Sequence, residues 1–304
     1  MSRGTQLAAG ALLAALGLAG CTEGRPATPA SSRVPRVGHV FVVIEENADY
    51  ARVMDSSSMP YLKSLARHYG LATEYYANTH PSIGNYFMLT VGKIVTNDDN
   101  YSGIVTEDNV VRRLLAAGKT WKSYAEDLPS VGYTGGDVGT YARKHNVIAL
   151  LSDVVNDQRQ LKNLVPFTQF AVDLANRTLP NYSMIVPNLC NDAHDPCACA
   201  THACALATAD TWLKVHIDPL IKSATFQRDG LLIIVFDEAN VGDNRRGGGR
   251  IAWVVVSPKA KRGFRSTTPY QHESTLRLTA KALGLSSFPH AAGTAPDMGE
   301  FFKP

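Results

Sequence analysis

The sequence lacks three features that often point to a functional class: a strong excess of one charge, internal repeats, and a second long apolar run. Its formal net charge is +3 over 304 residues. No basic face is concentrated enough to indicate nucleic acid binding, so we expect no nucleic acid partner. Beyond the first twenty residues, no apolar stretch is long enough to cross a bilayer.

The one long apolar run, Ala8–Leu18, belongs to an N-terminal targeting segment. Arg3 supplies a short positive region before it, and the run is too short for a permanent membrane helix. It ends at Leu18-Ala19-Gly20-Cys21, which resembles the lipobox of bacterial lipoproteins, where the cysteine is acylated and becomes the new N-terminus. The alternative is an ordinary secretory signal followed by a chance cysteine. We expect a lipoprotein signal peptide over residues 1–20 and a lipid on Cys21.

Residues 21–36 are rich in Pro, Ser, Thr, Ala and Gly, a composition typical of a flexible tether. Residues 37–304 fit one large domain with an ample core. We therefore expect an exported, monomeric protein of the cell envelope. Its lipid would hold it to a membrane on the periplasmic or the cell-surface side.

Cysteines are few, and four of the five lie close together: Cys190, Cys197, Cys199 and Cys204. In an exported protein this favours two disulfides, and the sequence cannot choose among the three pairings. A zinc or iron–sulfur site is the alternative, because His194 and His202 lie among them. Their spacing matches no standard zinc pattern, so we predict disulfides.

Apolar, β-branched runs alternate with amphipathic stretches along the domain. The runs predict buried strands at His39–Glu45, Ser183–Val186, Leu231–Phe236 and Ile251–Ser257. The amphipathic stretches predict helices at Met59–Tyr69, Val110–Ala117, Ala209–Ile221 and Ser274–Leu283. Near-continuous apolar strands suit a sheet covered on both faces. The pattern predicts a three-layer α/β/α sandwich with a mostly parallel central sheet.

Polar residues follow three of these strands directly. They are Glu45, Glu46 and Asn47 after the first, Asp192, His194 and Asp195 shortly after the second, and Asp237 and Glu238 after the third. In such folds, ligands bind beyond the carboxyl ends of the strands. Gathered carboxylates repel one another unless a cation neutralises them, which predicts a metal site. The alternative is helix capping and surface solvation.

A nucleophile is the second requirement of a hydrolytic site. Ser82 lies in Thr79-His80-Pro81-Ser82-Ile83-Gly84-Asn85-Tyr86, just before an apolar stretch that predicts a helix. Backbone N–H groups at a helix start can hold a phosphate, and a cation beside the hydroxyl would activate it for attack on phosphorus. The alternative role of Ser82 is a helix N-cap.

Seven motifs follow one another along residues 38–303. They are Val42–Asn47, His80–Tyr86, Trp121–Pro129, Tyr141–Asn146, Val186–Asp195, Phe236–Glu238 and Tyr270–Arg277. Each alone is unspecific, but in this order they resemble the bacterial and fungal phosphoesterase family that includes acid phosphatases and phospholipases C. That family belongs to the alkaline-phosphatase-like superfamily, so the resemblance implies an alkaline-phosphatase-like fold.

The resemblance also implies roles for individual residues. Glu46, Asn47, Asp237 and Glu238 would hold a divalent metal, and Asp192 would join them or hold a second ion. Ser82 would be the nucleophile, and His194 or His272 would protonate the leaving oxygen. The implied phosphate contacts are Asn85, Lys144 and His145. Oxygen ligands favour Mg, Ca or Mn, while histidine admits Zn or Fe, so we expect one or two such ions.

The sequence departs from the family pattern at two places. Glu273 follows His272 where an aromatic residue is common, and Gly84 stands where many relatives have proline. The chain is also short for the phospholipase C branch, which carries large additions. We therefore expect a phosphomonoesterase acting on small phosphate esters through a phosphoseryl intermediate. The alternatives are a phosphodiesterase or phospholipase C, and an inactive relative retained as a lipid-anchored binding protein.

Overall fold

The structure, a computed structural model, describes residues 1, 2, 4, 34–198 and 200–303. Residues 34–198 and 200–303 belong to one compact unit. Nearly all of the expected signal peptide and of the tether, including Cys21 with its expected lipid, lies outside the described residues. Among those described, no helix combines the length and the apolar character needed to cross a membrane.

The described residues form one eight-stranded sheet in the order β4-β3-β5-β1-β6-β7-β2-β8. The strands are β1 His39–Glu45, β2 Gly70–Ala72, β3 Trp121–Ala125, β4 Leu164–Pro166, β5 Tyr182–Val186, β6 Gly230–Phe236, β7 Trp253–Val256 and β8 Phe264–Ser266. All paired neighbours run parallel except at β7, which is antiparallel to β6 and to β2. The mostly parallel sheet is confirmed, with β7 as its one reversed strand.

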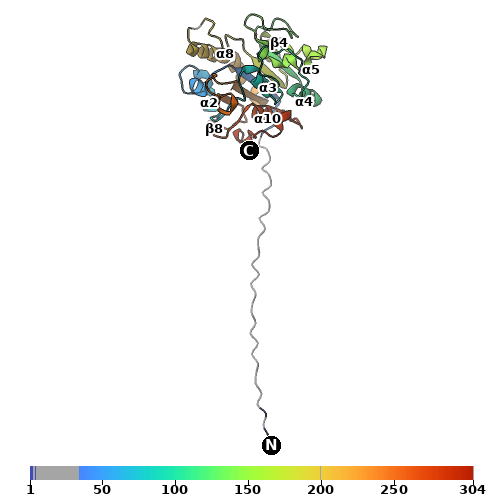
Figure 1. Ribbon diagram of the computed structural model, residues 1–304, viewed down its shortest axis with the longest axis vertical. Coiled ribbons are helices and arrows are strands. Elements are labelled where there is room, and N and C mark those ends of the chain that lie inside the picture. Colours follow the sequence, from blue (N-terminus) through green and yellow to red (C-terminus); the bar gives the residue numbers. More distant parts are fainter. Residues whose placement is uncertain (3, 5–33, 199, 304) are drawn as a thin grey trace. The chain divides into compact units, whose positions relative to one another are not determined.

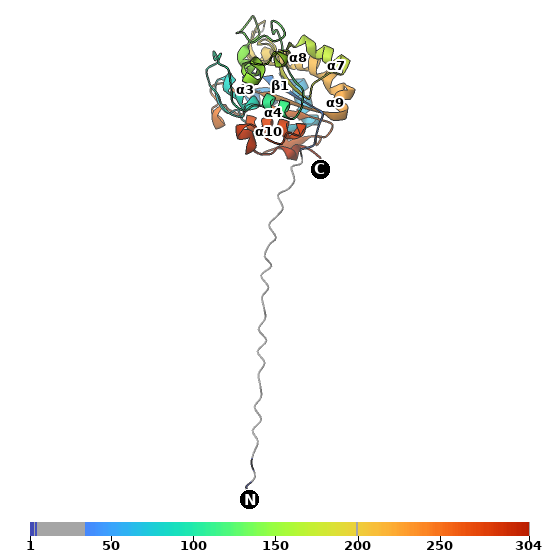
Figure 2. The ribbon, with the colours of Figure 1, turned by 90° about the vertical axis from the view of Figure 1, so that its right-hand side faces the viewer.

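The helices cover both faces of this sheet. They are α1 Tyr50–Met54, α2 Pro60–His68, α3 Ser82–Thr90, α4 Val110–Ala116, α5 Ser152–Val155, α6 Gln158–Leu161, α7 Thr168–Asn176, α8 His202–Lys222, α9 Ala224–Asp229 and α10 His272–Leu283. Figure 1 shows α8 and α10 on opposite sides of the strands, and Figure 2 shows α7, α8 and α9 across from α3, α4 and α10. The predicted α/β/α sandwich is therefore confirmed.

The four predicted strands are present because their apolar side chains are buried on both faces. Every residue of β6 is buried, and β1 is buried from Val40 to Glu45. Phe41 of β1 packs against Phe170 of α7 and Phe226 of α9, with ring centroids 6.3 and 6.2 Å away. The strands β2, β3, β4 and β8 were not predicted. Each is only three to five residues long, and β3 carries a lysine and a serine among its apolar residues.

Helix ends follow local capping. Helix α8 begins at His202 rather than at the predicted Ala209, because the Thr201 hydroxyl accepts a hydrogen bond from the Cys204 N–H at 3.3 Å. Helix α10 ends as predicted at Gly284, whose φ of 80° is left-handed.

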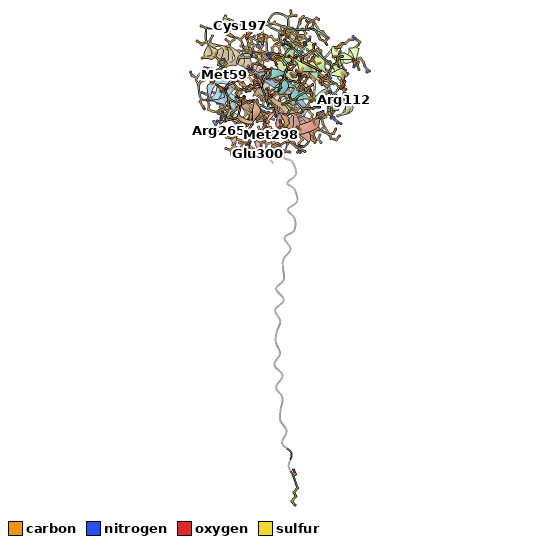
Figure 3. All side chains as sticks on the ribbon, in the orientation of Figure 1. Met59, Arg112, Cys197, Arg265, Met298 and Glu300 are labelled. Atoms are coloured by element: carbon orange, nitrogen blue, oxygen red, sulfur yellow. A yellow bond between two sulfur atoms is a disulfide. The ribbon has the colours of Figure 1, made fainter. Side chains whose placement is uncertain are left out.

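The predicted disulfides are present in part. Cys190 and Cys197 form a disulfide, with their Cα atoms 5.5 Å apart. Cys204 is also disulfide-bonded, and Cys199 lies outside the described residues. Figure 3 shows Cys197 at the outer edge of the domain. The Cys190–Cys197 bond closes the segment that follows β5, which carries Asp192 and His194.

Candidate active site

The site is built on the carboxyl ends of β1 and β6. These strands pair in parallel with Glu45 opposite Phe236, and the Asp237 N–H donates to the Glu45 carbonyl at 2.9 Å. The residues that follow each strand, Glu46 and Asp237, are therefore brought to the same edge. Neither is exposed to solvent. Two carboxylates are thus buried next to each other. Their burial costs free energy unless other groups compensate their charge.

Ser82 faces these carboxylates from the start of α3. It is buried, and its hydroxyl donates to Glu46 Oε2 at 3.1 Å. Tyr86, one helical turn later, donates its hydroxyl to Glu46 Oε1 at 2.6 Å. The Ser82 hydroxyl also lowers the pKa of Asp237, against the larger effects of burial and of the Glu46 and Glu238 charges, which raise it. The hydroxyl therefore lies between the ends of the two strands.

Glu238 has a separate set of partners. The Asn47 amide donates to its Oε1 at 2.8 Å, and His80 Nδ1 lies 2.8 Å from its Oε2. Asn85 Nδ2 lies farther from Glu238, at 3.4 Å from its Oε2, because the Asn85 amide is mainly bonded to the backbone. Asn85 Oδ1 accepts from the N–H groups of Asn78 and Thr79, and its Nδ2 donates to the Thr79 carbonyl. Asn85 thus holds the segment before Ser82 in place.

The carboxylates are short of compensating positive charge. Burial, and then the charges of Glu46 and Glu238, raise the pKa of Asp237 well above its usual range. Burial and the charge of Glu46 likewise raise the pKa of Glu238. The buried oxygens Asp237 Oδ2 and Asn47 Oδ1 have no hydrogen-bond partner among the described residues. A cation would satisfy both the charge and these oxygens.

The side chains as they stand do not form a finished metal centre. In residues 34–198 and 200–303, no three or more His, Cys, Asp or Glu side chains are arranged in a group that could hold a metal ion. The candidate set here also includes an amide and a hydroxyl, and its glutamates are bonded to protein donors. The donor chemistry fits a hard cation, but binding requires some of these hydrogen bonds to be exchanged.

A histidine–aspartate group borders the site on the β5 side. His145 is buried, stacks on Tyr86 with ring centroids 5.1 Å apart, and lies 3.3 Å from Glu46 Oε1. Its Nδ1 is 3.5 Å from Asp192 Oδ2. Burial lowers the pKa of His145 to about 4 and raises the pKa of Asp192 to about 8. His194 lies outside them, 6.3 Å from the His145 ring, with a side chain 32% exposed.

Lys144 is held beside the nucleophile by Asp99. Lys144 Nζ donates to Asp99 Oδ2 at 2.8 Å, while Asp99 Oδ1 accepts from the Ile83 N–H at 3.2 Å. Burial lowers the pKa of Lys144, but its bond to Asp99 and the charge of Glu46 outweigh burial and leave it raised. A permanent positive charge therefore lies near the first turn of α3.

His272 lies behind the site rather than in it. It is fully buried at the start of α10, and its Nε2 donates to the backbone carbonyl of Asp237 at 2.6 Å. Its Nδ1 is 3.4 Å from the Tyr75 hydroxyl, and burial lowers its pKa to about 4. In this geometry His272 orients Asp237, and its proton does not face the Ser82 hydroxyl.

With this geometry in view, comparison with known proteins identifies the family. The profile of the Phosphoesterase family matches residues 41–286, which include every residue named in the site. The chain belongs to the Phosphoesterase family.

Two relatives illustrate the likeness. A probable acid phosphatase of Kluyveromyces lactis is 31% identical over 78% of this chain, and the match covers 56% of that protein. A phosphatidylinositol-3-phosphatase of Mycobacterium tuberculosis is also 31% identical, over 88% of this chain and 84% of its own length. The chain thus spans little more than half of the first relative, but most of the second.

Solved structures show the fold. The lipoteichoic acid synthase LtaP from Listeria monocytogenes superposes with a TM-score of 0.62 at 11% identity, covering 86% of this chain and 76% of that one. A Vibrio parahaemolyticus protein of the alkaline phosphatase superfamily gives 0.59 at 14% identity, covering 84% and 68%. The expected alkaline-phosphatase-like fold is confirmed.

Several residues of the enzyme's site were not assigned from the sequence. Tyr86 could have been found, because it follows Ser82 by four positions on one helix face. His80 also lies within a motif that carries the family resemblance. Asp99 gave no signal, because it lies in a loop and meets Ile83 and Lys144 only in the folded chain.

Glycines fix the loop beside the nucleophile. The loop at Arg245–Arg250 contains three consecutive glycines that lie close to neighbouring atoms. A Cβ on Gly247 would lie 2.0 Å from the Asn78 carbonyl oxygen, and one on Gly248 would lie 2.4 Å from that of Thr79. Gly84 is similar, since a Cβ there would lie 2.3 Å from Asn97 Oδ1. These glycines let the chain before Ser82 lie against its neighbours.

We predict that Gly247→Ala lowers both activity and stability. The residue has a φ of 108° and no room for a methyl group, so the free energy of unfolding should fall by more than about 1 kcal/mol. Urea denaturation and phosphatase assays would measure both effects. Gly136→Ala is the control, because a Cβ there meets nothing within 4 Å. Equal behaviour of the two variants would contradict the packing argument.

Proposed function

We propose that this chain is a metal-dependent phosphomonoesterase that acts through a phosphoseryl intermediate on Ser82. The observation that carries the proposal is the buried Ser82 hydroxyl at the start of α3, which donates to Glu46 Oε2 at 3.1 Å and lowers the pKa of Asp237. A serine between carboxylates at the edge of a parallel sheet suits phosphoryl transfer, which needs positioning and charge compensation. The acid phosphatases among its relatives support a monoester substrate.

The cation would be held by oxygens from both strand ends. Glu46, Asn47, Asp237 and Glu238 offer these donors, and two of their oxygens are buried without a partner. Asn47 and Glu238, now joined at 2.8 Å, would exchange that bond for the ion. Asp192 is separated from this group by His145 and would serve only a second ion. When bound, the cation supplies positive charge against the phosphoryl oxygens and favours the ionised Ser82 hydroxyl.

The protein's own groups account for the remaining steps. Ser82 Oγ attacks phosphorus as its proton passes toward Glu46, which already accepts its hydrogen bond. Lys144 and the N–H groups at the start of α3 bind the phosphoryl oxygens. His194, exposed on the rim, protonates the leaving oxygen as the phosphorus–oxygen bond breaks. It then takes a proton from the water that cleaves the phosphoserine, and Glu46 returns its proton to the Ser82 oxygen as the serine–phosphorus bond breaks. His145 and Asn85 hold these groups in position.

We also propose that the enzyme is exported and anchored through a lipid on Cys21. The proposal depends on the targeting segment and the Leu18–Cys21 motif. Metabolic labelling with a fatty acid should mark the full-length protein expressed in bacteria, and Cys21→Ser should abolish the label. A label that persists in the variant would contradict lipidation at this residue.

We predict that Ser82→Ala lowers the turnover of p-nitrophenyl phosphate by at least about a thousandfold. Chelation should also abolish turnover of the wild type, and a divalent metal should restore it. The diester bis(p-nitrophenyl) phosphate, the bis-ester, should be cleaved much more slowly than the monoester.

Ser183→Ala is the matched control, because Ser183 is also fully buried and its hydroxyl has no partner among the described residues. It should retain activity. Full activity of Ser82→Ala would refute the nucleophile, and full activity after removal of all metal would refute the cation. A preference for the bis-ester would identify a phosphodiesterase. A folded, metal-loaded protein inactive on both esters would favour an inactive relative.

A second prediction concerns the leaving group. His194→Gln should lower the turnover of alkyl phosphates by about a hundredfold or more, because their leaving oxygens need a proton. The turnover of p-nitrophenyl phosphate should fall much less, because p-nitrophenolate leaves without one. Equal losses on both substrates would show that His194 is not the general acid.

A further inference from the structure

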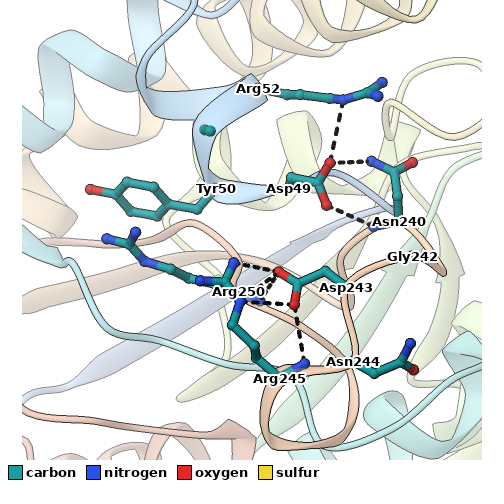
Figure 4. Close-up of a pocket in the computed structure, with 10 residues that line it drawn as sticks. Asp49, Tyr50, Arg52, Asn240, Gly242, Asp243, Asn244, Arg245 and Arg250 are labelled. Atoms are coloured by element: carbon teal, nitrogen blue, oxygen red, sulfur yellow. Dashed lines mark hydrogen bonds and ion pairs between the residues drawn. The ribbon is translucent and has the colours of Figure 1, made fainter.

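A second cavity lies beside the candidate active site. Its volume is about 950 Å³, and it is lined by residues 49–52, which follow β1, and by residues of the β6–β7 loop from Asn240 to Arg250. The two segments leave the same sheet edge that bears Glu46 and Asp237. Figure 4 shows their polar side chains in two groups, one around Asp49 and one around Asp243.

The first group joins a carboxylate, an amide and a guanidinium. Asp49 Oδ2 accepts from Asn240 Nδ2 at 2.7 Å and lies 3.3 Å from Arg52 Nε. Asp49 Oδ1 accepts from the Asn240 N–H at 3.2 Å. Asn240 is thereby fixed to the start of α1, while more than half of the Arg52 side chain remains exposed, at 55%.

The second group repeats this chemistry on the opposite segment. Asp243 Oδ1 accepts from Arg245 Nε at 2.9 Å, and its Oδ2 accepts from the Arg250 N–H at 3.1 Å. The Arg250 guanidinium covers the Tyr50 ring at 4.0 Å and is also paired with Glu74 at 3.4 Å. The aromatic face is therefore covered, and the groups left at the surface are polar.

One side chain connects this cavity to the proposed metal site. His80 lies with Nδ1 2.8 Å from Glu238 Oε2 and Nε2 3.1 Å from the Asp243 carbonyl. Along the chain, one residue separates Asn47 from Asp49, and one separates Glu238 from Asn240. A substrate whose phosphate lies at Ser82 could extend its alcohol portion along this direction.

The lining selects the chemistry of that portion. Each arginine has a carboxylate partner, Arg52 with Asp49, Arg245 with Asp243 and Arg250 with Glu74. No arginine of the lining is therefore left without a carboxylate partner to bind a second anion. Its covered tyrosine offers no apolar face to an acyl chain or an aryl ring. Carboxylate, amide and guanidinium groups placed together present donors and acceptors at once, which is the complement of adjacent hydroxyl groups.

We propose that this cavity binds the polyhydroxylated alcohol portion of the substrate, such as a hexose or cyclitol carrying a phosphate monoester. The inference rests on the proposed phosphomonoesterase function and specifies its substrate class. Asn240 and Arg245, one from each group, are the residues that determine this specificity.

The test compares polyol phosphates with an aryl phosphate that has no hydroxyl groups to bind. We expect glucose 6-phosphate or myo-inositol 1-phosphate to depend on the cavity, and phenyl phosphate to serve as the reference. Asn240→Ala and Arg245→Ala should each lower kcat/KM for the polyol phosphates about tenfold more than for phenyl phosphate, the effect of one lost hydrogen bond. In the Ser82→Ala background, calorimetry should show the same loss in the binding of glucose 6-phosphate.

Arg159→Ala is the matched control for Arg245→Ala. Arg159 is paired with Asp157 at the same spacing, with Nη2 2.9 Å from Oδ2, and lies outside both the site and the cavity. Arg159→Ala should leave kcat/KM unchanged for both the polyol phosphates and phenyl phosphate. Thermal melting would show that both Arg245→Ala and Asn240→Ala are folded.

Each outcome separates the inference from the proposed function. Equal losses on polyol and aryl substrates would overturn the cavity's role. So would a loss confined to a substrate with a second phosphate, such as fructose 1,6-bisphosphate, because it would indicate an anion site. A wild type that cleaves phenyl phosphate, together with variants that leave kcat/KM for the polyol phosphates unchanged, would overturn the inference and leave the phosphomonoesterase standing. A wild type that cleaves no monoester would overturn both.

Discussion

The parallel pairing of β1 with β6 is the constraint on which the site depends. Its register places Glu46 beside Asp237 and Glu238 at one sheet edge, with all three excluded from water. Their mutual repulsion is a cost that the surrounding residues reduce but do not remove. Tyr86 and Ser82 donate to Glu46, and Asn47 and His80 bond to Glu238. The site is thus an arrangement of donors around buried acid groups.

Alternation along β1 separates two adjacent glutamates. Glu46 turns to the nucleophile, whereas both carboxyl oxygens of Glu45 are buried without a hydrogen-bond partner among the described residues. Burial, and then the charge of Asp192, raise the pKa of Glu45 well above its usual range. Two neighbouring residues of one type therefore differ in their partners because a strand directs them to different surroundings.

Much of this architecture could be predicted from the sequence, because apolar runs locate strands and strand ends locate carboxylates. The same reasoning placed Ser82 at a helix start. What it could not supply depends on contacts between distant segments. Asp99 links Lys144 to α3 from a loop, and His272 lies behind Asp237 although its motif favours an acid. The reversed direction of β7 and the packing of Gly247 likewise have no local signal.

The reversal of β7 has a consequence for how enzymes of this architecture can diverge. A parallel neighbour to β6 would need a crossover helix, whereas an antiparallel one needs only a hairpin. The hairpin begins with Asp237 and Glu238 and then forms one wall of the neighbouring cavity. The part that lines the cavity before Gly247 can change in sequence without moving any helix of the sandwich, whereas Gly247 and Gly248 are fixed against the chain before Ser82. The residues proposed for catalysis and those proposed for substrate specificity thus lie on one connection between β6 and β7. Only the residues that line the cavity are free to vary.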